Sequence, residues 1–215
     1  MQQGMKQSET KAQIIEVARK LFAKRGVESI TMNDIAVASE FGRRTLYTYF
    51  KSKEELFWAV VASEQAKALK TMEAITDKDI PADEKIIELI YTRLRGARDV
   101  VSRNGSLRGS FFRDIWMVEH VRKEFDLREM KMIEKVLTAG KEEGVFKIEH
   151  IDLLAEFFHY CIKGLEVPFI RGKLGKNLSD SEIKRYVKKM VFTILGHDEQ
   201  AQEDKEEPSA PQKTV

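Results

Sequence analysis

Apolar residues recur every three or four positions along most of the chain, the spacing of one face of an α-helix. The first such stripe begins at Ile14 and stops before Gly26, and glycine commonly ends helices. Three Ser/Thr-x-x-Asp/Glu sequences, which begin at Thr31, Ser52 and Ser179, match the capping box of a helix N-terminus. The pattern therefore predicts that helices begin at these three positions.

The other stripes predict further helices, and no segment predicts a convincing strand. Only four prolines and few alternations of Val, Thr and Ile argue against an all-β fold. We expect an all-α protein of about nine helices. The first helix ends before Gly26 and the second begins at Thr31. The other helices are expected at about 43–50, from Ser52 into the mid-70s, from Pro81 to about 101, at about 111–116 (a shorter helix), at about 121–143, from 151 to a kink or end at Pro168, and at 179–195.

The composition indicates a globular protein without a membrane span. Of the 215 residues, 42% are hydrophobic and 33% charged, too apolar for global disorder. The longest apolar run, 56–62, is far shorter than the roughly 18 residues that cross a bilayer. A single cysteine, Cys161, cannot form an internal disulfide, so we expect the cytoplasm as the compartment.

Charge is unevenly distributed along the chain. Residues 1–53 carry ten Lys or Arg against five Asp or Glu, whereas residues 54–197 carry 25 against 24 and residues 198–215 carry two against six. A basic N-terminal part beside a nearly neutral body indicates contact with a polyanion, although an ordinary solvated face would also explain the excess. The acidic tail, 198–215, is expected to be disordered.

Residues 31–50 have the dimensions of a helix-turn-helix, with two short helices joined by a turn of about four residues. At 100° per residue, Leu46 and Phe50 lie on nearly the same side of the second helix and should face the protein. Arg44 and Thr48 then point away from that core. A helix that enters the major groove of DNA needs this division between an apolar face and an outward polar face.

The side-chain chemistry of this segment divides the expected DNA contacts into two groups. Forked or short polar groups on the outward face can bond to base edges, whereas hydroxyl and ammonium groups on the flanks suit phosphates. The alternative for the two tyrosines is that they are packing aromatics. The expected base contacts are Arg43, Arg44, Thr45, Thr48 and Asn33, and the expected phosphate contacts are Thr31, Tyr47, Tyr49, Lys51 and Lys53.

Three sequences in this part of the chain resemble the DNA-binding domain of tetracycline-repressor (TetR) family regulators. They are Ile14-Ile-Glu-Val-Ala-Arg-Lys-Leu-Phe22 with Gly26, Thr31-Met-Asn-Asp-Ile-Ala36, and Thr45-Leu-Tyr-Thr-Tyr-Phe-Lys-Ser-Lys-Glu-Glu-Leu-Phe57. The resemblance is specific over residues 10–60. Over 61–197 it extends only to length, helix order and helical character.

The resemblance implies a DNA-binding domain at 1–53, with 31–50 as its reading unit, and an effector-binding and dimerisation domain at 54–197. It implies a ligand-responsive repressor that binds palindromic double-stranded DNA as a homodimer through its last two long helices. An unidentified small molecule would be the effector. No cofactor, metal or catalytic residue is expected.

Two positions depart from the family pattern. The family usually has a small residue, often glycine, where this chain has Glu40, and often serine where it has Gly42. Glu40 is therefore expected in a costly backbone conformation, or in a slightly different turn. Gly42 can precede a helix but offers no side-chain oxygen to cap it.

Two groups of side chains in the body are candidates for an apolar effector pocket. Such clusters are more often ordinary core. The first group is Phe111, Phe112, Trp116, Met117 and His120, and the second is Phe157, Tyr160 and Cys161.

The alternative function is a helical-bundle enzyme or a lipid- or small-molecule-binding protein without a DNA function. Glu156 and His159 have the Glu-x-x-His spacing of di-iron bundles, but that chemistry needs a second such pair, and the chain has none. Phosphate-binding, dinucleotide, CxxC and nucleophile-elbow motifs are also missing from the sequence. The sequence therefore favours DNA binding over catalysis.

Overall fold

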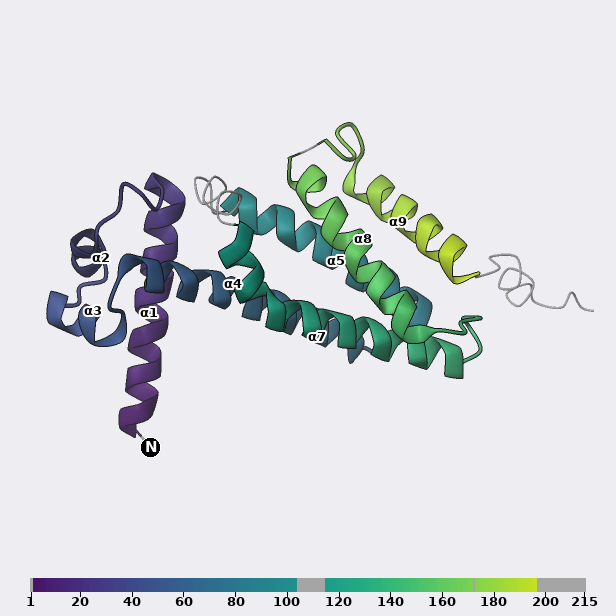
Figure 1. Cartoon of the computed structure of the whole chain (residues 1–215), viewed down its shortest axis with the longest axis horizontal. Helices are drawn as coiled ribbons and strands as arrows, with labels where there is room; N and C mark the ends of the chain where they lie inside the picture. Colours follow the sequence, from purple (N-terminus) through teal and green to yellow (C-terminus); the bar gives the residue numbers. More distant parts are fainter. Residues whose placement is uncertain (1, 104–114, 172, 197–215) are drawn as a thin grey trace, which may run out of the picture.

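The computed structural model describes residues 2–103, 115–171 and 173–196, which form eight helices and no strand (Figure 1). This confirms the all-α class. The helices are α1 (Gln2–Arg25), α2 (Met32–Ala38), α3 (Arg43–Tyr49), α4 (Lys53–Thr76), α5 (Ala82–Arg103), α7 (Ile115–Glu142), α8 (Ile151–Ile170) and α9 (Asp180–Leu195).

The helices pack around two hydrophobic clusters. The N-terminal cluster joins α1, α2, α3 and the first half of α4, from Ile14 to Val61. The second cluster begins at Leu69 in the same helix and includes residues of α5, α7, α8 and α9. Figure 1 accordingly shows α1–α3 at one end of α4 and the longer helices of the body at the other. The domain division after residue 53 stays a prediction, because α4 contributes to both clusters.

Most of the expected helix ends are confirmed. Gly26 follows α1 with a φ of 84°, and Thr31 and Ser179 each form both bonds of a capping box. Ser52 forms only one of them: its hydroxyl accepts a hydrogen bond from the Glu55 N–H, whereas the Glu55 carboxylate accepts from the backbone N–H of Lys51.

One expectation about the body was wrong, and one of the two alternatives at Pro168 is excluded. Ile115 and Trp116 belong to the same long helix as residues 121–142, and not to a separate shorter one; the rest of the expected short helix lies outside the described residues. Pro168 does not end its helix, because α8 continues to Ile170 and the Arg171 N–H closes its last turn on the Val167 carbonyl. The proline has no N–H to donate to the carbonyl four residues earlier, so α8 lacks this one hydrogen bond.

The apolar side chains of α8 and α9 differ in how far they are buried. In α8 the apolar stripe faces inward, with Ala155, Phe158 and Ile162 buried. In α9, Met190 and Ile194 also belong to the apolar pattern but are 38% and 37% exposed. The helix instead packs along a row of residues spaced by four, namely Ile183, Val187, Val191 and Leu195, together with Phe192.

None of the described helices is long and apolar enough to cross a membrane. The expected disordered tail, 198–215, lies outside the described residues.

Candidate nucleic-acid interface

Helix α3 has the orientation that the sequence predicts. Leu46 and Phe50 are 0% and 2% exposed and belong to the N-terminal cluster, so this side of the helix is fixed to the protein. Arg44 and Thr48, on the opposite side, are exposed. The exposed face of α3 is therefore open to a partner, as entry into a DNA groove requires.

The other residues of α3 lie between these two sides. Arg43 is exposed and Thr45 half-buried, so both guanidinium groups at the start of the helix reach solvent. Tyr47 is half-exposed, whereas Tyr49 is more covered and packs against the N-terminal cluster. Tyr49 therefore has a packing role, and both tyrosines stay predicted phosphate contacts.

A hydrogen bond within α3 restrains one expected base contact. The Thr48 hydroxyl donates to the Arg44 carbonyl, 2.9 Å away and one turn earlier. The hydroxyl oxygen keeps free lone pairs, and the methyl group lies beside them. Thr48 can therefore accept a hydrogen bond from a base or contact a thymine methyl.

Helix α2 begins with a closed capping box. The Thr31 N–H and hydroxyl both donate to the Asp34 carboxylate, at 2.8 and 2.7 Å, and the Thr31 hydroxyl accepts from the Asp34 N–H. These bonds from Thr31 lower the pKa of Asp34 below its usual value. A phosphate contact by Thr31 would have to compete with this carboxylate. The side chain of Asn33 is exposed and takes no part in the capping box.

The two lysines after α3 differ in their environment. The Lys51 side chain is exposed. The Lys53 ammonium donates to the Val27 carbonyl at 2.9 Å, which ties the start of α4 to the turn after α1. Lys53 therefore has a structural role in addition to the phosphate contact predicted for it.

The turn between α2 and α3 contains the strain that the sequence predicts. Glu40 has a φ of 59°, in the left-handed region that favours glycine, and is the one non-glycine residue with positive φ among those described. Gly42 precedes α3 without a side-chain cap, and a Cβ built on it meets no atom within 4 Å. The helix-turn-helix therefore keeps its geometry despite the Glu40 side chain.

We expect Glu40→Gly to raise the free energy of unfolding by about 0.5–1 kcal/mol, because glycine adopts this φ without the cost of a Cβ. Thermal unfolding followed by circular dichroism measures the change. Glu28→Gly is the matched control, since Glu28 is also an exposed glutamate in a turn of this domain but has no positive φ. It should not stabilise the protein. Equal effects of the two substitutions would contradict strain at Glu40.

The structure describes only some of the residues expected to contact an effector. Phe111 and Phe112 lie outside the described residues, and for Trp116, Met117 and His120 only the helix is described. Phe157 and Tyr160 are 50% and 65% exposed on the outer side of α8, and Cys161 is half-buried beside them. Of these, Tyr160 borders an open hollow of about 270 Å³ between α7 and α8.

Sequence reasoning missed a buried network of charges in the body. Arg93 of α5 lies 2.7 Å from Glu129 of α7 and 3.3 Å from Glu166 of α8, and Arg122 of α7 lies 2.7 Å from the same Glu166. Burial opposes ionisation of Glu166, but the two arginines hold the pKa of its carboxyl below the usual range. The only signal in the sequence is charged residues on otherwise apolar helices, and it does not identify the partners.

A short helical hairpin that turns an exposed Arg and Thr face outward defines the class of DNA-binding helix-turn-helix proteins. The family described as "Bacterial regulatory proteins, tetR family" matches residues 14–60, which include the whole hairpin. This match assigns residues 14–60 to the DNA-binding domain of the TetR family, and the relatives and solved structures described next are similar regulators.

Two curated relatives are themselves regulators. YfiR, an uncharacterised HTH-type transcriptional regulator of Bacillus subtilis (strain 168), is 25% identical over 151 residues, 68% of this chain and 73% of its own length. An uncharacterised HTH-type regulator of Mycobacterium tuberculosis is 41% identical over 87 residues, 40% of this chain and 43% of its own length.

The similarity extends to the body in three dimensions. A transcriptional regulator from Cytophaga hutchinsonii, solved by crystallography, is 26% identical with a TM-score of 0.65, and the match covers 85% of this chain and 93% of that one. The arrangement of the C-terminal helices is therefore shared with a solved regulator.

Proposed function

We propose that this protein is a ligand-responsive repressor that binds palindromic operators as a homodimer. The observation that carries the proposal is the orientation of α3, with Leu46 and Phe50 buried and Arg44 and Thr48 exposed. The basic excess of residues 1–53 supports attraction to the DNA backbone. The protein acts by binding, in the cytoplasm, and not by catalysis.

Dimerisation is supported by apolar side chains on the outer faces of the last two helices. In α8 they recur at Leu153, Phe157, Tyr160 and Val167, with exposed fractions between 38% and 65%. Gly164 continues this stripe, and a Cβ there would meet no atom within 4 Å. In α9 they recur every four residues, at Tyr186, Met190 and Ile194. Both helices pack against α5 on their other side, so these faces are left for a second copy.

A dimer would also explain how so short a reading helix specifies a site. Helix α3 has seven residues and reaches few base pairs. Two copies related by a twofold axis read two half-sites about one helical turn, roughly 34 Å, apart. The operator is then a palindrome, because the symmetry of the site mirrors that of the protein.

We expect Phe157→Glu to raise the dimer dissociation constant at least tenfold, because a carboxylate would be buried in an apolar interface without a partner. Sedimentation velocity over a range of protein concentrations measures the constant. Val37→Glu, at a residue of α2 that is 72% exposed, is the matched control and should leave it unchanged. If Phe157→Glu self-associates like the unmodified protein, the dimer does not use this face.

Gel-shift titrations at increasing salt test the DNA-binding function, with fragments selected from the source genome. If a dimer neutralises several phosphates, the logarithm of its association constant should fall linearly with the logarithm of the salt concentration. The slope should then be about minus several units. Binding that does not depend on salt, or no binding to any fragment, would instead support the alternative of a helical-bundle enzyme or small-molecule-binding protein without a DNA function.

The effector acts through linkage. It and the operator must prefer different conformations, so that each weakens the binding of the other by the same factor. We place the effector in the body because that domain is joined to the reading unit through α4, which packs against α1 as well as α5 and α7.

A further inference from the structure

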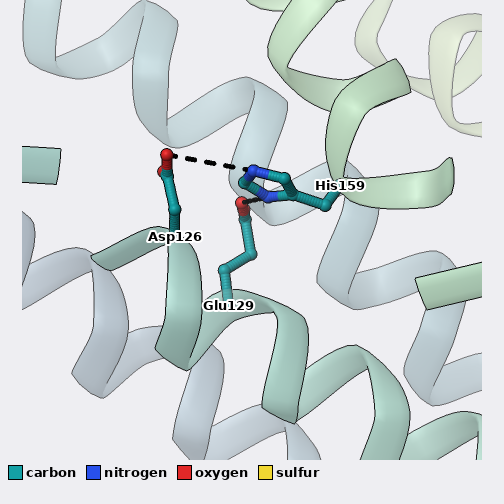
Figure 2. A group of neighbouring side chains, drawn as sticks. All are labelled: Asp126, Glu129 and His159. Atoms are coloured by element: carbon teal, nitrogen blue, oxygen red, sulfur yellow. Dashed lines mark hydrogen bonds and ion pairs between the residues drawn. The ribbon is translucent and has the colours of Figure 1, made fainter. Parts of the chain in front are cut away.

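His159 lies in an unusual position for a histidine that the DNA-binding function does not use. Its side chain, on α8, is 3% exposed and lies between two carboxylates of α7 (Figure 2). The Nδ1 atom is 2.7 Å from Oε2 of Glu129, and the Nε2 atom is 3.9 Å from Oδ2 of Asp126. These three residues offer ligand atoms that all lie within 4.8 Å of one another.

The contact with Glu129 determines what Nε2 can do. Glu129 is 1% exposed, and its other carboxylate oxygen lies 2.7 Å from the Nε atom of Arg93. When the Glu129 carboxylate accepts a hydrogen bond from Nδ1–H across this 2.7 Å contact, the free lone pair of the imidazole lies on Nε2. A carboxylate that orients a histidine in this way is the usual support of a metal-binding imidazole.

The opposite nitrogen has no hydrogen bond to any residue in the described ranges. At 3.9 Å, Asp126 is too distant to bond to Nε2 directly. A tetrahedral metal with bonds of about 2.0–2.1 Å to both atoms would hold them about 3.4 Å apart, so a movement of about 0.5 Å suffices.

The surroundings provide space and access for a cation. Asp126 and His159 border the hollow between α7 and α8, where water can complete the coordination. A cation already lies at the carboxylate, because the Lys163 ammonium is 2.8 Å from Oδ2 of Asp126. The Lys163 side chain is 30% exposed, so it can leave this position for solvent.

We propose that Nε2 of His159 and the carboxylate of Asp126 bind a divalent transition-metal cation of the Zn²⁺ class, with Glu129 orienting the imidazole and Lys163 displaced. Nitrogen and carboxylate ligands with open positions suit Zn²⁺. The site links α7 to α8 and does not depend on the DNA-binding function. Its failure would leave the proposed function untouched.

Titration of the full-length, untagged protein with Zn²⁺ alone, in competition with a chromophoric chelator, tests the site. His159→Gln should weaken Zn²⁺ binding at least tenfold, because the amide can still donate to Glu129 but offers no imidazole ligand. His150→Gln is the matched control, since His150 is exposed ahead of α8 and should not affect binding. Circular dichroism establishes that both variants are folded.

Two further variants separate a metal site from a purely structural ion pair. Asp126→Asn and Lys163→Met remove opposite partners of the same 2.8 Å contact. Asp126→Asn should weaken Zn²⁺ binding at least tenfold, whereas Lys163→Met should strengthen it severalfold because the competing ammonium is gone. The proposal is overturned if the unmodified protein does not bind Zn²⁺, or if the two variants change the affinity in the same direction.

Discussion

Replacing Arg93 by methionine should lower the free energy of unfolding by about 3–5 kcal/mol, the cost of removing one partner of a buried ion pair. Arg93 is 6% exposed and pairs with Glu129 and Glu166, and its guanidinium lies 4.9 Å from the centre of the Phe125 ring. Methionine would keep part of the packing but leave Glu129 without its arginine. Among the residues that the structure describes, Glu166 would retain Arg122.

Equilibrium unfolding in urea measures this loss. Arg95→Met is the matched control, because Arg95 lies on the same helix, is 53% exposed and forms a surface pair with Asp99 at 3.7 Å. Such a surface pair contributes at most about 0.5 kcal/mol. Similar losses in the two variants would mean that the buried network does not hold α5, α7 and α8 together.

Replacing Arg44 by alanine should weaken binding to the selected operator by about 1–3 kcal/mol, or roughly 5- to 150-fold. Arg44 lies on the exposed side of α3, opposite the buried Leu46, so truncation leaves the fold intact. Because a guanidinium reads a guanine through two bonds, the variant should also lose its preference at one base pair of each half-site.

Gel shifts with the operator and with variants changed at single base pairs measure both effects. Arg95→Ala, on an exposed arginine of the body, is the control and should bind like the unmodified protein. If Arg44→Ala lost the same affinity for every sequence, Arg44 would contact a phosphate and not a base.

The parts of the structure that the sequence predicts well are those that local interactions determine. The caps at Thr31 and Ser179 involve residues three apart, and the sides of α3 follow from the helical repeat. The strain at Glu40 was expected because a glycine is usual at that place in the family. Each of these features can be predicted without knowing which distant parts of the chain pack together.

The missed features depend on contacts between separate helices. Asp126 and His159 are 33 positions apart, and no periodicity indicates that they meet. The same limit applies to Phe157, which was expected beside a pocket and is half-exposed on the outer side of α8. An apolar stripe identifies a face of a helix but does not say whether that face packs within one subunit or against another.

Helix α4 is one continuous helix that connects α1–α3 to the body. Its 24 residues extend about 36 Å without a break, with one end fixed among α1–α3 and the other among α5 and α7. A tilt of about 5° at the body end would displace the far end by about 3 Å, close to the rise of one base pair. A rearrangement too small to disturb the packing of the body would therefore be enough to move a reading helix out of register with its half-site.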